Sequence, residues 1–127
     1  MSNLFKGILI DQSVSNPENV LKYAKVISKR ETTLEGESFR GKVLFYDIEV
    51  TDNNLQSVLK EVAETIKSPG WYFHLVNKDL LYIVMPKKIL KATNNEAELK
   101  DIIEYATSHG IHPEQLNLKQ LFNDPFA

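Results

Sequence analysis

The sequence predicts an α+β domain, and three patterns of apolar residues lead to this prediction. Residues 71–85 hold two runs of β-branched and aromatic residues around a short polar turn, which is typical of a β-hairpin. Lys42–Asp52 alternates apolar and polar residues as a strand does, and an amphipathic helix pattern follows it directly. With a strand before them and a helix after them, these elements predict a ferredoxin-like antiparallel sheet with helices on one face and an extra C-terminal helix.

Length and composition indicate a single globular domain over residues 1–127. Hydrophobic residues make up 43% of the chain and charged residues 25%, which are average values for globular proteins. The absence of cysteine excludes disulfides and thiolate chemistry, and it agrees with a cytoplasmic location. A net charge of −2 without a basic block argues against nucleic-acid binding, and no apolar run is long enough to span a membrane. Because no cofactor-binding motif occurs, no cofactor is predicted.

The first part of the chain is predicted to hold a strand, a helix and an irregular segment. Leu4–Ile10 has the pattern of a strand, in which Gly7 marks a bulge or a close approach of another backbone. Asn16 caps a predicted helix that runs on an apolar stripe to about Lys29. Glu31–Gly41 follows no period and is interpreted as a short edge strand, a flap over a site or a surface connection.

The predicted strand Lys42–Asp52 is followed by the clearest helix of the sequence. The alternation places Asp47 and Glu49 together on the face of the strand opposite its core residues. Asp52 or Asn53 is predicted to cap the helix. Its apolar residues recur three and four positions apart and form one buried stripe: Leu55, Val58, Leu59, Val62, Ala63 and Ile66.

The register of the hairpin decides which side chains of residues 71–85 share a face. A three-residue loop, Asn77–Asp79, pairs Leu75 with Leu81 and separates an apolar face from one with polar tips. The apolar face, predicted to be core, holds Trp71, Phe73, Leu75, Leu81, Ile83 and Met85. The other face, predicted to be the open face of the sheet, holds Tyr72, His74, Val76, Tyr82 and Val84, and Asp47 and Glu49 of the preceding strand lie on it too.

The part after the hairpin is predicted to be mainly helical. Ile89-Leu90 extends the second hairpin strand or forms another short one. Asn95 caps a helix that ends at His109-Gly110, and Pro113 begins one further helical turn. The apolar residues of the tail, from Leu118 to Phe126, are predicted to pack on this domain or on a partner.

Several short motifs in the C-terminal half stand out: Pro69-Gly70-Trp71-Tyr72, Leu81–Pro86, Glu104-Tyr105, Gly110-Ile111 and Gln115-Leu116. In these motifs the chain resembles a family of small uncharacterised bacterial proteins. Members of that family often have proline directly after the Gly-Ile pair, whereas His112 occupies this position here. The resemblance implies a bacterial cytoplasmic protein, and it supplies no catalytic residue.

Five residues of the predicted open face are candidates for a ligand site or an interface: Tyr72, His74, Tyr82, Asp47 and Glu49. The tyrosines can stack on a planar ligand or fill a two-fold interface. His74 titrates near neutral pH, and paired carboxylates serve as acid and base or hold a cation. The structural alternative is that these groups only complete and solvate the sheet. The spacing of His109 and His112 around Gly110 does not predict a metal site.

Three functions agree with these patterns. The favoured one is a non-enzymatic binding module that self-associates as a homodimer through the open sheet face, because a monomer would leave its apolar residues in water. The first alternative is a small-molecule-binding protein or enzyme that uses His74 with Asp47 or Glu49. The second alternative is a protein inhibitor or antitoxin-like partner, as small size and mild acidity suggest.

Overall fold

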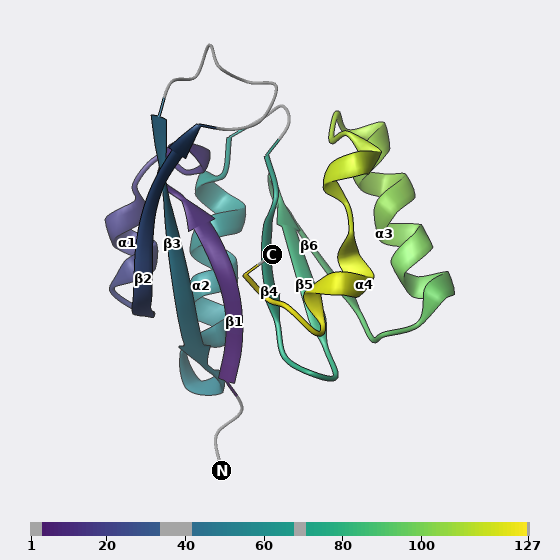
Figure 1. Ribbon diagram of the computed structural model, residues 1–127, viewed down its shortest axis with the longest axis horizontal. Helices are drawn as coiled ribbons and strands as arrows, with labels where there is room; N and C mark the ends of the chain where they lie inside the picture. Colours follow the sequence, from purple (N-terminus) through teal and green to yellow (C-terminus); the bar gives the residue numbers. More distant parts are fainter. Residues whose placement is uncertain (1–3, 34–41, 68–70, 127) are drawn as a thin grey trace.

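The computed structural model describes residues 4–33, 42–67 and 71–126, which form one six-stranded sheet with helical elements on both sides (Figure 1). The strands are β1 (Leu4–Ile10), β2 (Lys25–Thr33), β3 (Lys42–Thr51), β4 (Phe73–Val76), β5 (Leu81–Met85) and β6 (Lys88–Ala92). The helices are α1 (Pro17–Leu21), α2 (Asp52–Thr65), α3 (Glu96–Ser108) and α4 (Leu118–Leu121), with 3-10 turns at Asp11–Ser13 and Pro113–Gln115.

The strands follow the order β2-β3-β1-β4-β5-β6, and each neighbouring pair is antiparallel. The predicted α+β class is therefore confirmed. The order of the six strands does not by itself establish the ferredoxin-like arrangement that was predicted with it. We call β2, β3 and β1 the open half of the sheet, and β4, β5 and β6 the closed half, because β4 and β5 are buried on both faces.

The predicted helix over residues 16–29 is wrong in its second part. α1 ends at Leu21, and hydrogen bonds from Tyr23 N and Ala24 N to carbonyls three residues earlier close a tight turn. The chain then enters β2, which pairs with β3 from Lys25 to Thr33.

Strand pairing prevails over the helical pattern for two reasons. Val26 and Ile27 are β-branched, so they fit a strand better than a helix. A short helix is stable only if it buries an apolar face, and the described side chains of β2 are exposed. These residues therefore gain little stability from a helix. Of the irregular segment Glu31–Gly41, residues 31–33 complete β2, and residues 34–41 lie outside the described part of the chain.

Gly7 allows the two halves of the sheet to meet. It lies in the middle of β1, where an added Cβ would be 2.0 Å from the carbonyl oxygen of His74 in β4. Because that distance is far inside van der Waals contact, any side chain at position 7 would push β4 away from β1. The close backbone approach predicted at Gly7 is confirmed.

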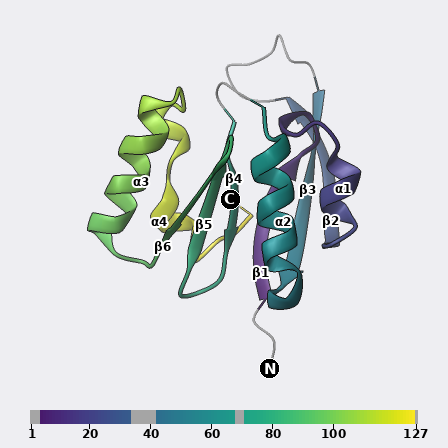
Figure 2. The ribbon, with the colours of Figure 1, turned by 180° about the vertical axis from the view of Figure 1, so that it is seen from behind.

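α1 and α2 cover one face of the sheet, which we call the inner face (Figure 2). The predicted stripe of α2, from Leu55 to Ile66, is buried there, as expected. The predicted cap at Asp52 or Asn53 is wrong, because the N-cap residue is Thr51, which makes no side-chain capping bond. The strands contribute seven large apolar residues to this first core: Phe5, Leu9, Ile48, Val50, Phe73, Leu75 and Val84.

The opposite face, which we call the outer face, is covered over the closed half, so the prediction of helices on one face only is wrong. α3 and the segment from Ile111 to Leu121 pack there and form a second core. The Asn95 side chain caps α3 by accepting bonds from Ala97 N and Glu98 N, and the helix ends before Gly110, whose φ is 95°. The tail thus packs on its own domain.

The hairpin loop contains four residues instead of three, and this changes the predicted faces. Val76 pairs with Leu81, and the Asn77 side chain accepts bonds from Asp79 N and Leu80 N at 2.8 and 2.7 Å, which fixes the longer turn. One extra residue turns the whole second strand over. Leu81, Ile83 and Met85 therefore join the outer face, whereas Tyr82 and Val84 join the inner face.

Candidate functional site

The five candidate residues do not lie on one open face. Tyr82 lies on the inner face, where its ring meets that of Phe5 edge-on with centroids 5.7 Å apart. Tyr72 and His74 lie on the outer face of the closed half, under the C-terminal segment. Asp47 and Glu49 lie on the outer face of the open half. The four-residue hairpin loop separates the two tyrosines, and the C-terminal segment covers the histidine.

His74 is buried and bonded to the C-terminal segment. Its side chain is 7% exposed, and its Nε2 lies 2.7 Å from the carbonyl oxygen of Pro125. Because a carbonyl oxygen can only accept a hydrogen bond, Nε2 of His74 must carry a proton and donate it. Both the Nε2-protonated neutral ring and the charged ring meet this requirement. Burial lowers the pKa of His74, and the bond to Pro125 opposes this effect. At neutral pH the residue is therefore a neutral hydrogen-bond donor that fastens the tail.

Tyr72, the residue directly before β4, makes a second polar contact with the C-terminal segment. Its hydroxyl donates to the carbonyl oxygen of Gln115 at 2.5 Å. Burial raises the pKa of Tyr72 to about 12, so the phenol stays protonated at any physiological pH. Tyr72 and His74 together hold the two ends of the segment that runs from Gln115 to Pro125.

Asp47 is held by β2 instead of by a histidine. Its carboxylate accepts bonds from Ser28 Oγ at 2.7 Å and from an Arg30 guanidinium nitrogen at 2.9 Å. Glu49, two residues on, lies 4.0 Å from Lys6 Nζ in a looser ion pair. Because β1 lies between β3 and β4, the spacing of strands alone separates Asp47 from His74 by about 10 Å. The predicted histidine–carboxylate pairing is therefore not present.

In the described part of the chain, neither of the two cores includes a side chain from the outer face of β2 or β3, and the tail only borders this surface beside Lys6 of β1. We call this surface the open-half face and define it by Lys6, Ile8, Ser28, Arg30, Phe45, Asp47 and Glu49. Ile8 and Phe45 are half-buried, and the Arg30 guanidinium lies 5.5 Å from the Phe45 ring. Sequence reasoning missed Ser28 and Arg30 because it placed them at the end of a helix. The alternation of residues 42–52 in the sequence already placed Phe45 on the same strand face as Asp47.

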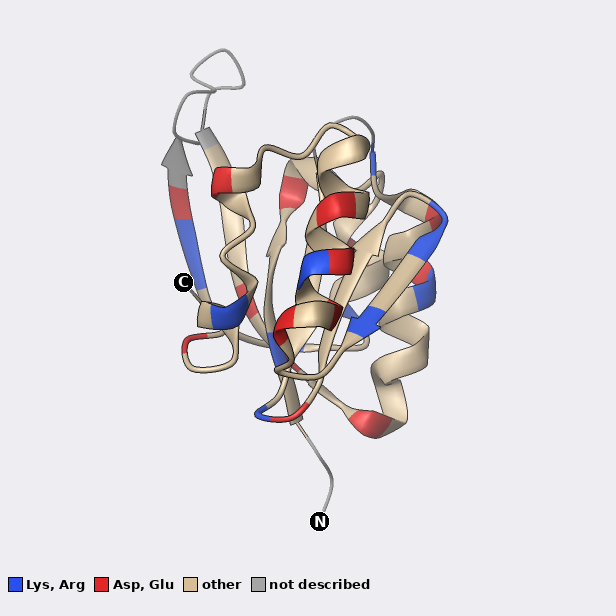
Figure 3. Ribbon diagram, turned by 90° about the vertical axis from the view of Figure 1, so that its right-hand side faces the viewer, with Lys and Arg blue, Asp and Glu red and all other residues tan. Residues whose placement is uncertain are grey.

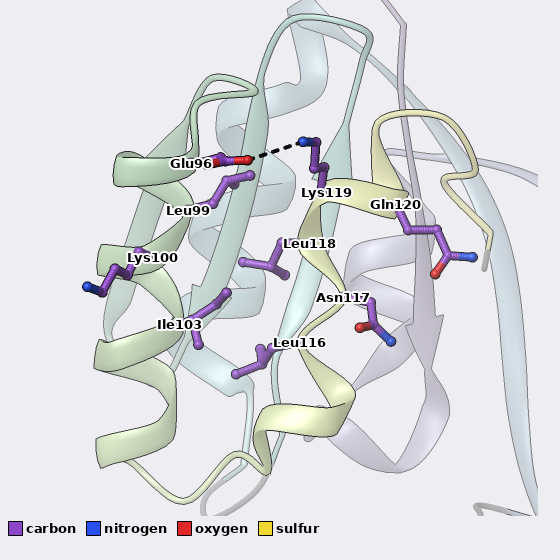
Figure 4. A pocket seen from close by; sticks show the side chains of 9 residues that line it. All are labelled: Glu96, Leu99, Lys100, Ile103, Leu116, Asn117, Leu118, Lys119 and Gln120. Atoms are coloured by element: carbon purple, nitrogen blue, oxygen red, sulfur yellow. Dashed lines mark ion pairs between the residues drawn. The ribbon is translucent and has the colours of Figure 1, made fainter.

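A groove lies between α3 and the C-terminal segment, with a volume of about 400 Å³. Its floor consists of Leu99, Ile103, Leu116 and Leu118, whose side chains point toward one another between the two segments (Figure 4). At one end, Glu96 and Lys119 reach toward each other, 3.5 Å apart. We call this the α3 groove. The apolar tail residues were noted in the sequence, but the groove depends on where the tail packs.

The remaining histidines have local structural roles. His109 is the C-cap residue of α3, where its Nδ1 lies 2.8 Å from the Tyr105 carbonyl and its ring stacks on the Tyr105 ring. His112 lies 4.0 Å from Glu114. Within the described ranges, no group of three His, Asp or Glu residues is placed to hold a metal ion. In the same part of the chain, no helix has the length and apolar character needed to cross a membrane.

Comparison of the chain with models of protein families finds no match, and comparisons with curated proteins and with solved structures find none either. The resemblance to small bacterial proteins therefore stays a prediction. Function has to be argued from the geometry of the chain itself.

Proposed function

We propose that the protein is a non-enzymatic binding module that self-associates through the open-half face. The observation that carries this proposal is the unequal cover of the sheet. α3 and the C-terminal segment pack on the outer face of β4–β6, and among the described residues their core includes no side chain of β1, β2 or β3. The end of the tail reaches only the border of the open-half face, where Phe122 and Pro125 line a hollow with Lys6. Half-buried apolar side chains, Ile8 and Phe45, lie on that uncovered surface, and a second copy would remove them from water.

The charges of the open-half face suit a second copy of the same chain. Lys6 and Arg30 pair with Glu49 and Asp47, and Lys25, opposite Glu49 in the ladder, leaves one positive charge in excess, so two such faces repel each other little. In a two-fold interface the same patch contributes to both sides, and a balanced patch can be complementary to itself. A face with little net charge does not attract a strongly charged partner. The charges therefore favour self-association over binding of a nucleic acid or a basic peptide.

Packing face to face is favoured over pairing of strand edges. β2 is an edge strand, and an exposed edge can add a strand from another chain. The pairing of β2 with β3 is interrupted by an irregularity between Val26 and Ser28. β2 also carries three basic residues, Lys25, Lys29 and Arg30. A bulge and lysines are the usual features that prevent edge pairing. The face therefore remains as the surface for a second copy.

The test is the mass of the protein in solution, measured by light scattering at tens of micromolar. We expect twice 14.5 kDa for the wild type. Ile8→Lys should give the monomer, since a lysine opposite Asp47 is tolerated in the free chain but is buried in the interface. Ile89→Lys, at an exposed position on β6, is the matched control and should remain dimeric. A monomeric wild type would refute self-association.

The geometry does not favour the enzyme alternative. His74 is buried and bonded to Pro125, and Asp47 is bonded to Ser28 and Arg30, so neither group is free to face a substrate. A general base must come within hydrogen-bond reach of the proton that it removes. The inhibitor-like alternative has no contact that favours it, and it stays a prediction.

We also propose that the elements from β1 to β4 form a ferredoxin-like unit, which β5, β6 and α3 extend. The order β2-β3-β1-β4 with a helix after β1 and another after β3 supports this proposal. β1 and β2 are each antiparallel to β3 and hence parallel to each other, as in a split β-α-β unit. An experimental structure in which β3 does not lie between β1 and β2 would contradict it.

A further inference from the structure

We propose that the α3 groove binds a small amphipathic carboxylate, that is, an apolar chain or ring that carries one carboxylate group. The groove lies over the closed half of the sheet, apart from the open-half face. It is lined by one side of α3 and by the segment from Leu116 to Gln120. Ligand binding there is therefore independent of self-association.

The floor of the groove is apolar and rigid. Leu99, Leu116 and Leu118 belong to the second core and are at most 5% exposed, while Ile103 is half-buried beside them. Because these side chains are held by core packing, the surface exists before a ligand arrives, which lowers the entropy cost of binding. A volume of about 400 Å³ falls in the range of pockets that take small molecules.

The ion pair at one end of the groove provides the polar contact. Lys119 Nζ lies 3.5 Å from Glu96 Oε1, and the two side chains are 67% and 89% exposed. An ion pair this exposed contributes little to stability, so its partners exchange easily. A ligand carboxylate can replace that of Glu96 beside Lys119 while the apolar part of the ligand covers the floor.

The charges around the groove favour a negative ligand group over a positive one. Lys119 and Lys100 line the groove, against a single acid, Glu96. Figure 3 shows further acidic positions along α3, which include Glu98, Asp101 and Glu104, and Lys100 lies 4.0 Å from Glu104. Lys119 is therefore the lysine that is left for a ligand carboxylate, and Asp101 is not among the residues that line the groove.

The proposal can be tested with three probes that share one chain: octanoate, n-octanol and octylamine. Each is titrated into the ¹⁵N-labelled protein, and the amide shifts are followed by NMR. We expect octanoate to bind saturably, with shifts centred on residues 96–103 and 116–120, and to bind more tightly than octanol and octylamine. Light scattering of the same samples should show no change in mass, which separates this result from the proposed self-association.

Two variants remove, one at a time, the charges that the proposal uses. Lys119→Gln should weaken octanoate binding about threefold or more, whereas Glu96→Gln should strengthen it by a similar factor, because it frees Lys119 from its competitor. Lys91→Gln, an exposed lysine on β6 outside the groove, is the matched control and should bind as the wild type does.

Three outcomes would overturn the proposal. Shifts that spread over both cores without saturation would show non-specific partitioning. Equal affinity for octanol would show that the carboxylate makes no contact, and tighter binding of octylamine would assign the polar contact to Glu96. Since all substituted side chains are exposed, loss of folding cannot explain a change in affinity.

Discussion

The two halves of the sheet have similar strands but different surroundings. β4 and β5 are buried on both faces, between α2 on one side and α3 with the C-terminal segment on the other. In the open half, the outer face carries side chains such as Lys6 and Glu49 that remain partly in water. A strand that is buried on both faces is held in place by apolar packing. A strand with one open face keeps side chains available for contacts with other molecules.

The seam between the halves is expected to show the largest effect of a single substitution. Gly7→Ala places a methyl group 2.0 Å from the His74 carbonyl oxygen, so β1 and β4 must separate. We expect a loss of about 3 kcal/mol or more in the free energy of unfolding, as for severe overpacking. Urea denaturation measures it, with Leu4→Ala at an exposed position of the same strand as the control. A variant as stable as the wild type would show that the halves are not in such close contact.

α2 serves both halves, whereas α3 serves only the closed one. Leu59→Ala should cost roughly 2–4 kcal/mol, because Leu59 is buried in the middle of the α2 stripe. Ile102→Ala in α3 should cost a similar amount globally. Hydrogen exchange distinguishes the two, since only the α3 variant should raise local exchange in α3 and β6 while β2 and β3 keep their protection. Equal increases in all strands would show that the halves unfold as one unit.

In the open half, polar contacts take the place of a second core. Asp47→Ala removes the acceptor of Ser28 and Arg30 and should cost about 1–2 kcal/mol. Glu49→Ala, which loses only a 4.0 Å ion pair, should cost less than about 0.5 kcal/mol. The two substituted residues lie two positions apart on the same face of β3, so each variant is a control for the other. Denaturation midpoints that do not differ would show that the Asp47 contacts add nothing.

The closed half should make stability depend on pH through His74. Its pKa in the folded protein is below the ordinary value of 6.5, because the ring is buried. Well above pH 6.5, His74 is neutral in both the folded and the unfolded chain. As pH falls below it the unfolded chain binds a proton first, so stability decreases until the folded pKa is reached, by at most about 1.4 kcal/mol per pH unit. His74→Gln should flatten this fall in stability as the pH decreases below about 6.5. An equally steep dependence in the variant would assign it to other groups.

Part of this contrast could be predicted from the sequence. The stripe of α2 was predicted correctly because its period continues over several turns, and Asn95 and Gly110 marked the ends of α3 by their capping chemistry. The close approach at Gly7 was predictable because a glycine inside an apolar strand commonly marks a bulge or a neighbouring backbone. These signals are local, and each depends on a few neighbouring residues.

The candidate site could not be predicted, because it depends on contacts that are distant in sequence. The Asn77 turn added one residue to the hairpin loop, and this moved Tyr82 to the inner face. The helical spacing of Val20, Ala24 and Ile27 was indistinguishable from a short helix and a strand in succession, so Ser28 and Arg30 were misplaced. Burial of His74 follows from the position of Pro125, which no local pattern encodes.

The central place of β1 also has a consequence for how fast the protein folds. β2 with β3, and β4 with β5 and β6, are hairpins of neighbouring strands that can close early. β1 pairs on one side with β3 and on the other with β4, and its pairing of Lys6 with Val76 spans more than half of the chain. Such high contact order slows folding, so we expect docking of β1 to be the rate-limiting step. Leu9→Ala should then slow refolding in stopped-flow experiments, and a nascent chain should not begin to join the two halves of its sheet until β4 has been synthesised.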